Sequence, residues 1–198
     1  MRLWITGYRS YELGIFKNDD PKIDVLKYCL RKVFERKADE GLEWIISGGQ
    51  LGIEQWALTE AVEFTKEFMG IKTALMYPYA EFSKNWQEEK QLKLLQLEQQ
   101  VDFFANVSKT PYTSPAQLKN YQQFMLAHTD QAVMIYDPEY PGKTKYDYDI
   151  VKKYQEKHAY QLELVDMYQL QDEAQQYLEN KIQWIKNLNF KILFTNIY

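Results

Sequence analysis

The sequence contains few residues that could cross-link it or bind a metal ion. Its 198 residues include one cysteine and two histidines. Cys29 has no partner for an internal disulfide and one cysteine cannot build a zinc site, so no metal site is predicted. A lone thiol is typical of a reducing compartment, and we therefore expect a cytoplasmic protein.

Long apolar runs and an excess of basic residues are also absent. No stretch approaches the roughly 18 consecutive apolar residues of a membrane-spanning helix, and the start, MRLWITGYRS, lacks the apolar core of a secretory signal. The formal net charge of -4 provides no general attraction to nucleic acid or to an anionic membrane. We therefore expect neither as a partner, although a local basic groove is compatible with this charge.

The chain instead shows apolar runs of strand length that alternate with longer segments of helical period. This alternation predicts an α/β fold in which helices flank a mostly parallel sheet. The expected strands are residues 2–6, 44–47, 72–77, 101–106, 131–136 and 161–165. The expected helices are residues 21–41, 53–68, 86–100, 115–128, 150–157 and 170–185, the first of them capped by Asp20 and Pro21.

We expect one domain over residues 1–180 and a C-terminal extension of unknown role over residues 181–198. The final segment, NFKILFTNIY, is apolar, and it fits an added edge strand, an oligomer contact or a disordered tail. Leu170, Ala174, Tyr177 and Leu178 form an apolar stripe that fits either the core or a contact in a homo-oligomer.

The segment SGGQLG follows the second expected strand and opens the second helix. The first N–H groups of a helix lack internal partners and carry partial positive charge, and glycines allow a phosphate to approach the backbone closely. Ser47, Gly48, Gly49 and Gly52 therefore form a candidate anion-binding turn. The alternative is that these residues only make a tight connection between strand and helix.

Two common nucleotide-binding motifs do not fit. Ser47-x-Gly49-x-x-Gly52 approximates a dinucleotide fingerprint, but the acidic residue expected after the next strand is missing, because that strand ends in Tyr77-Pro78-Tyr79. Gly142-Lys143-Thr144 resembles the end of a P-loop, but the earlier glycine of that motif would fall at Asp137. The sequence therefore predicts neither a standard dinucleotide site nor a P-loop ATPase.

Other candidate ligand contacts follow the remaining strands. The carboxyl ends of parallel strands meet at one edge of a sheet, where ligands usually bind. At this edge Arg9 is suited to pair with a phosphate, and an aromatic ring from Tyr77, Tyr79 or Trp86 is suited to stack on a base. Lys143 and Thr144 supply a second potential anion contact. Ordinary surface or core roles are the alternative for each of these side chains.

With these segments assembled, the chain resembles the YpsA family of the SLOG superfamily, which also contains the LOG proteins and the Rossmann-like domain of DprA. The matching segments are ITGYRSYELG, IISGGQLGIEQWA, MYPYAEFSKNW and VMIYDPEYPGKTKYDYDIV, which together span residues 1–177. The resemblance implies a three-layer, Rossmann-like α/β fold that binds a nucleotide or an ADP-ribose-like or NAD-like ligand. The implied site comprises Gly7, Arg9, Ser47, Gly48, Gly49, Gly52, Glu54, Gly142, Lys143 and Thr144.

The sequence departs from the LOG enzymes at one motif. Those proteins carry P-G-G-x-G-T-x-x-E, whose glutamate acts in cleaving an N-glycosidic bond, whereas the loop here reads PGKTKYD. Two glycines and the glutamate are missing, so hydrolysis by that route is not expected unless Asp147 or Asp149 substitutes. No catalytic residue is assigned, and the sequence leaves open whether the protein is an enzyme.

Three functional hypotheses follow. The favoured one is a nucleotide sensor that acts through a protein partner, with Glu54 bonded to a ribose hydroxyl; the resemblance also implies a link to bacterial cell division. The second is a nucleotide hydrolase that uses Glu54, Asp137 or Asp147, whereas Cys29 reads as a buried thiol and His128 and His158 as helix-end residues. The third, single-strand DNA binding by analogy with DprA, conflicts with the acidic balance.

Overall fold

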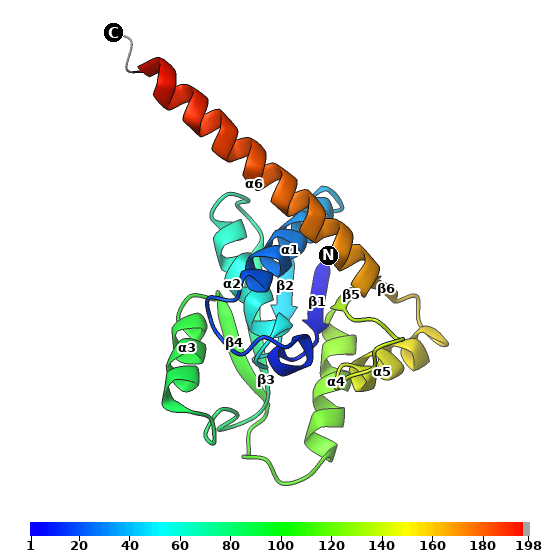
Figure 1. The fold of residues 1–198 in the computed structure, drawn as a ribbon. Helices are drawn as coiled ribbons and strands as arrows, with labels where there is room; N and C mark the ends of the chain where they lie inside the picture. The colour runs from blue at the N-terminus through cyan, green and yellow to red at the C-terminus, as the bar shows by residue number, and fades with distance from the viewer. Residues whose placement is uncertain (196–198) are drawn as a thin grey trace.

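The fold is a parallel sheet between two layers of helices (Figure 1). A computed structural model describes the backbone of residues 1–195 and the side chains of residues 1–184. Within these residues the strands are β1 (Arg2–Gly7), β2 (Trp44–Ser47), β3 (Lys72–Tyr79), β4 (Phe103–Ser108), β5 (Gln131–Ile135) and β6 (Gln161–Val165). The helices are η1 (Ser10–Leu13), α1 (Pro21–Asp39), α2 (Ile53–Thr65), α3 (Glu88–Glu98), α4 (Ala116–His128), α5 (Lys145–Gln155) and α6 (Met167–Thr195).

The strand order is β4-β3-β2-β1-β5-β6, and every pairing is parallel. Parallel strands need crossover connections, which are nearly always right-handed, so the helices fall on both faces of the sheet. Helix α1 packs against α2 and α6 on one face, and α4 packs against α5 on the other. The predicted α/β fold with a mostly parallel sheet is confirmed.

The central strands are buried because helices cover both of their faces. Leu3, Trp4 and Ile5 of β1 and all five residues of β5 are shielded from solvent. Continuous apolar runs, rather than alternating ones, are what a doubly covered parallel strand requires. Helix α1 starts as expected, because the Asp20 carboxylate accepts a hydrogen bond from the N–H of Lys22 at 3.0 Å and Pro21 follows the cap.

Three predictions about individual elements are corrected. Strand β3 runs through Pro78 rather than stopping before it, because β2 ends opposite Leu75 and leaves one side of β3 without a neighbour. Helix α5 starts at Lys145, five residues before its expected start at 150, which places Asp147 in its first turn. Helix α3 covers Glu88–Glu98, which is shorter than the expected 86–100, and its buried leucines are Leu94 and Leu97.

Helix α6 is longer than expected and extends away from the body of the protein (Figure 1). Its first half lies on α1, where the tilted rings of Tyr177 and Tyr28 pack with their centroids 5.5 Å apart and Glu173 pairs with Lys32 at 2.7 Å. The helix continues to Thr195, so the backbone of residues 189–195 does not form the edge strand that was considered. Residues 196–198 and the side chains of residues 185–195 lie outside the described part, and an oligomer contact there stays a prediction.

Candidate functional site

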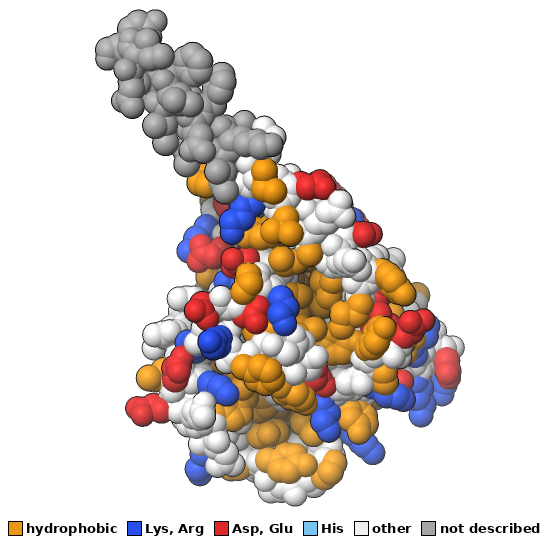
Figure 2. All heavy atoms as spheres, viewed as in Figure 1, with side chains coloured by type: hydrophobic (Ala, Val, Ile, Leu, Met, Phe, Trp, Pro, Cys, Tyr) orange, Lys and Arg blue, Asp and Glu red, His pale blue; other side chains and the backbone are white. Residues whose placement is uncertain are grey.

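A groove of about 1340 Å³ lies at the carboxyl edge of the sheet. Its walls come from the segments after β1, β2 and β3 and from helices α4 and α5. The chain runs from β1 outward to β4 and then returns to β5 on the other side of β1, so the connections diverge between β1 and β5. This switch point is where open parallel sheets bind ligands. Figure 2 shows apolar side chains lining a recess on this part of the molecule.

The glycine turn and the segment after β1 form one unit at the groove. The N–H of Ser10 donates to Leu51 at 3.0 Å, and the N–H of Ile53 donates to Tyr8 at 3.1 Å. Gly52, between them, has a φ of +123°, and a Cβ there would lie 2.5 Å from the carbonyl oxygen of Tyr8. Only glycine satisfies both conditions, so Gly52 holds the start of α2 against the backbone of Arg9.

Glu54 lies at the floor of the groove and is almost completely buried. Its Oε1 accepts from the Thr6 hydroxyl at 2.9 Å and from the Arg9 guanidinium at 3.2 Å. Its Oε2 accepts from the backbone N–H of Gln50 at 2.9 Å. The carboxylate of Glu54 therefore already occupies one of the backbone donors that the sequence offered to a phosphate.

Asp147, from the first turn of α5, is the second buried carboxyl group at the groove floor. Gln122 donates to its Oδ1 at 2.7 Å, and the Thr6 hydroxyl lies 3.5 Å from its Oδ2. Burial raises the pKa of this carboxyl from 3.8 to about 6, although Arg9 and the bond from Gln122 act in the opposite direction. The group can therefore change its protonation state close to neutral pH.

Two buried hydroxyl groups have no hydrogen-bond partner among the described residues: that of Tyr121, which feels the charges of Glu54 and Asp147, and that of Thr144 at the start of α5. Tyr121 comes from α4 and lines the groove, and its hydroxyl lies so close to Gly48 that a Cβ there would be 2.7 Å away. Burial, with the charges of Glu54 and Asp147, raises the pKa of the Tyr121 hydroxyl well above 10, so it stays a donor. Buried polar groups without partners are uncommon, and a bound water, a bound ion or a functional role accounts for many of them.

Several residues expected to contact the ligand lie behind the groove wall. Gly7, Ser47, Gly48, Gly49, Tyr77 and Thr144 are buried and are not among the residues that line the groove. The Ser47 hydroxyl donates to the carbonyl of Ile5 at 2.5 Å. The Tyr77 hydroxyl bonds Glu98 at 2.9 Å, and the Tyr77 ring fills the space that a side chain at Gly49 would need. In this structure these residues shape the wall from behind.

The loop containing Gly142 and Lys143 is joined to the segment after β1 by Glu12. The Glu12 carboxylate accepts from the N–H of Arg9 at 2.7 Å and from the N–H of Lys143 at 2.6 Å. Gly142 packs so closely on this carboxylate that a Cβ would lie 2.4 Å from its Oε1. This arrangement places the Lys143 side chain in the groove, together with Arg9, Gly52 and Glu54, as expected.

The groove has a positive charge balance although the chain is acidic. Three carboxyl groups line it, those of Glu54, Asp147 and Asp149, against seven cationic side chains: Arg9, Lys17, Lys90, Lys93, Lys119, Lys143 and Lys153. Among the described residues, the ammonium groups of Lys119, Lys143 and Lys153 form no ion pair. These exposed lysines concentrate positive potential at the groove, which attracts anionic ligands.

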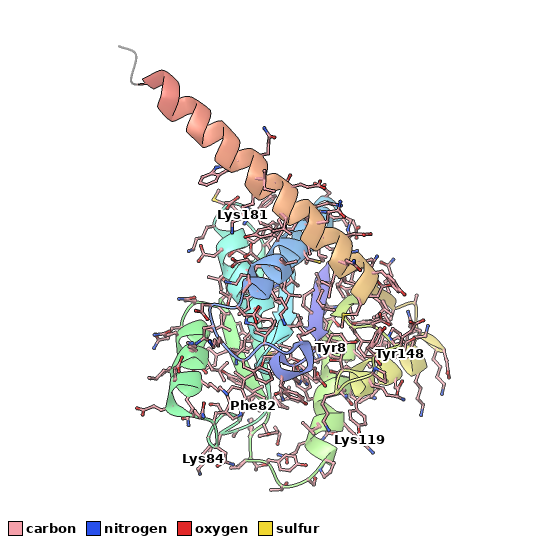
Figure 3. All side chains as sticks on the ribbon, viewed as in Figure 1. Tyr8, Phe82, Lys84, Lys119, Tyr148 and Lys181 are labelled. Atoms are coloured by element: carbon pink, nitrogen blue, oxygen red, sulfur yellow. The ribbon has the colours of Figure 1, made fainter. Side chains whose placement is uncertain are left out.

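Aromatic side chains also reach the groove, and they come from several segments: Tyr11, Phe16, Trp56, Trp86, Tyr112 and Tyr146. Figure 3 shows how the two sides of this edge are formed, with Phe82 and Lys84 after β3 on one side and Lys119 of α4 on the other. Phe82 packs on Trp86 with ring centroids 5.3 Å apart. Trp86 is therefore held in place at the wall, whereas Tyr77 and Tyr79 do not line it.

Sequence reasoning missed Thr6, Tyr121 and Gln122. Thr6 is the penultimate residue of a buried strand, and Tyr121 and Gln122 lie within an amphipathic helix. Residues at such positions usually belong to the core or the surface, and no local motif distinguishes them. Only the convergence of β1, α4 and α5 at one point shows that these side chains meet.

The sheet topology and the groove at its switch point define a Rossmann-like α/β domain with a ligand-sized site. The chain belongs to the YpsA family: a family model described as the YspA SLOG family matches residues 3–170. A UPF0398 protein of Lactobacillus gasseri is 58% identical over 180 residues, which cover 90% of this chain and 95% of that protein. A UPF0398 protein of Ligilactobacillus salivarius is 55% identical over 90% of this chain and 98% of its own length.

The family predicted from the four sequence segments is thereby confirmed. A UPF0398 protein of Limosilactobacillus reuteri, 55% identical over 91% of this chain and 96% of its own length, agrees with it. Within the residues that the structure describes, no helix combines the length and apolar character needed to cross a membrane.

Proposed function

We propose that this protein binds a nucleotide or a nucleotide derivative such as ADP-ribose in the groove at the carboxyl edge of the sheet. The observation that carries the proposal is the joint presence of unpaired lysines and aromatic rings around the switch point. A nucleotide carries negative charge at one end and a flat base at the other, and this groove offers partners for both. Its volume of about 1340 Å³ accommodates a dinucleotide-sized molecule.

The biological role that fits this binding is a cytoplasmic sensor or regulator. In this role, the liganded protein would act on a protein partner, in keeping with the link to bacterial cell division that the family resemblance implies. Many groups at the floor of the groove bond one another, which suits a protein that recognises its ligand rather than one that turns it over.

Isothermal titration calorimetry with ADP-ribose, ADP and NAD tests the binding proposal. Lys119→Ala and Lys143→Ala should each weaken the binding of a phosphorylated ligand by about fivefold, because each removes a charged contact worth about 1 kcal/mol. Lys66→Ala is the matched control, since Lys66 is an exposed lysine outside the groove that pairs with Glu63 at 2.7 Å. The absence of binding by all three ligands at millimolar concentration would refute the proposal.

Hydrolysis of an N-glycosidic bond is the second candidate function, and one observation favours it. Asp147 lines the groove, and its pKa of about 6 suits a group that donates a proton near neutral pH. Chromatography of ADP-ribose, AMP and NAD after incubation with the protein tests this activity. Release of adenine or nicotinamide by the wild type, but not by Asp147→Asn, would favour the enzyme over the sensor.

A further inference from the structure

The buried polar cluster at the groove floor has unequal numbers of donors and acceptors. We define it as Thr6, Arg9, Glu54, Tyr121 and Asp147. The Thr6 hydroxyl lies 2.9 Å from Glu54 and 3.5 Å from Asp147, but it carries a single proton, and the shorter bond to Glu54 takes it. Among the described residues, Oδ2 of Asp147 therefore lacks a good donor, while the Tyr121 hydroxyl lacks an acceptor.

The charge of this cluster argues against a phosphate at the same point. Glu54 and an ionised Asp147 outnumber the single guanidinium of Arg9, and Glu54 already blocks the N–H of Gln50. A phosphate monoester is mostly a dianion at neutral pH and would be repelled by two carboxylates. A neutral hydroxyl group suits the cluster, because it donates to a carboxylate and accepts from Tyr121 at the same time.

We propose that this cluster is a subsite for the vicinal hydroxyl groups of a ribose, with Tyr121 as a ligand contact that distinguishes ribose from its deoxy forms. The carboxylates of Glu54 and Asp147 both lie close to the Thr6 hydroxyl, so they are close to each other. Two carboxylates at such a short separation can each accept a hydrogen bond from one of two adjacent sugar hydroxyls. The phosphates then lie farther out, on the groove lysines. The inference rests on the proposed nucleotide binding and adds the class of sugar.

Calorimetry with ADP and with 2′,3′-dideoxy-ADP tests the subsite. The wild type should bind ADP at least about tenfold more tightly, because a missing hydroxyl leaves a buried carboxylate without its partner. In Tyr121→Phe this preference should fall to a few-fold at most. Tyr146→Phe is the matched control: Tyr146 also lines the groove but is exposed, so removing its hydroxyl should leave the preference for ADP over dideoxy-ADP unchanged.

Stability and a second pair of probes separate the possible outcomes. Tyr121→Phe removes a hydroxyl that bonds to none of the described residues, so thermal unfolding should show no loss of stability. Equal affinity for ADP and its dideoxy form would overturn the ribose subsite but leave nucleotide binding intact. A third outcome is that no nucleotide binds, but ribose 5-phosphate binds more tightly than inorganic phosphate and Tyr121→Phe abolishes this difference. That outcome would support the ribose subsite and overturn the proposed nucleotide binding. If none of these ligands binds, both the ribose subsite and the nucleotide binding are overturned.

Discussion

At the scale of single residues, Asp147 links the site to the stability of the protein. Its carboxyl is buried, and its pKa in the folded state is about 6 rather than the usual 3.8. The folded protein thus holds this proton more tightly than the unfolded chain, so the contribution of Asp147 to stability falls as the pH rises from about 4 to about 6. Above about pH 6 the loss is complete.

Asp147→Asn should remove this loss of folding stability, because asparagine carries no titrating proton. The variant should be more stable than the wild type above about pH 6, by up to about 3 kcal/mol, and the gap should close as the pH falls to about 4. Urea unfolding across this pH range measures it. Asp149→Asn, an exposed site on the same helix, should not reproduce the pattern. A gap that is independent of pH would show that Asp147 is not held in a buried, proton-binding state.

Residues of the site differed in how far the sequence could predict them. Arg9, Glu54 and Lys143 follow strands or open helices, and the rule that strand ends meet at one edge brought them together correctly. Tyr77 follows the same rule but points into the space beside Gly49, because the neighbouring α3 supplies Glu98 as its partner. Tyr121 could not be found, since its role depends on how α4 packs rather than on its neighbours in the chain.

At the scale of elements, the junction between β1 and α2 depends on Gly52. Gly52→Ala should destabilise the protein by roughly 3 kcal/mol or more, because it adds a backbone clash to the strain of a positive φ. Gly70→Ala is the matched control: Gly70 also has a positive φ, +99°, but no atom of the described residues lies within 4 Å of the position its Cβ would take. Gly70→Ala should lower the free energy of unfolding by only about 1 kcal/mol, because it adds backbone strain without a clash.

Chemical unfolding of the two glycine variants compares the costs directly. Equal losses would mean that the segment after β1 moves away from the alanine at position 52 without penalty. In that case the backbone of the groove wall, which depends on the contact between Arg9 and Gly52, would be able to move at little cost in free energy.

The strands and helices were predictable where burial determines the pattern, as in β1, β5 and α1. The residues at which strands and helices begin and end were less predictable. The start of α5 was placed late because KYDYD looks polar, whereas in the fold Asp147 turns inward to meet Gln122. The length of α6 was underestimated because the apolar composition of residues 189–195 suits a strand and a helix alike.

At the scale of the whole molecule, the distribution of charge matters more than its sum. The chain has a net charge of -4, yet its groove gathers seven cationic side chains. Raising the salt concentration from well below to above the physiological level should therefore weaken ADP-ribose binding several-fold, since the Debye length falls below about 8 Å. Adenosine, which lacks phosphates, is the matched ligand, and its affinity should not change. Salt-independent binding of ADP-ribose would show that the lysines do not contact its phosphates.

The direction of α6 has a practical consequence. The helix starts at the carboxyl edge of the sheet and runs back along α1 beyond the opposite edge (Figure 1). Its 29 residues correspond to about 44 Å at 1.5 Å per residue. A biotin or affinity tag attached near the described end of α6 is thereby kept on the far side from the groove. The protein can thus be immobilised on a sensor chip with the groove facing the flowing solution.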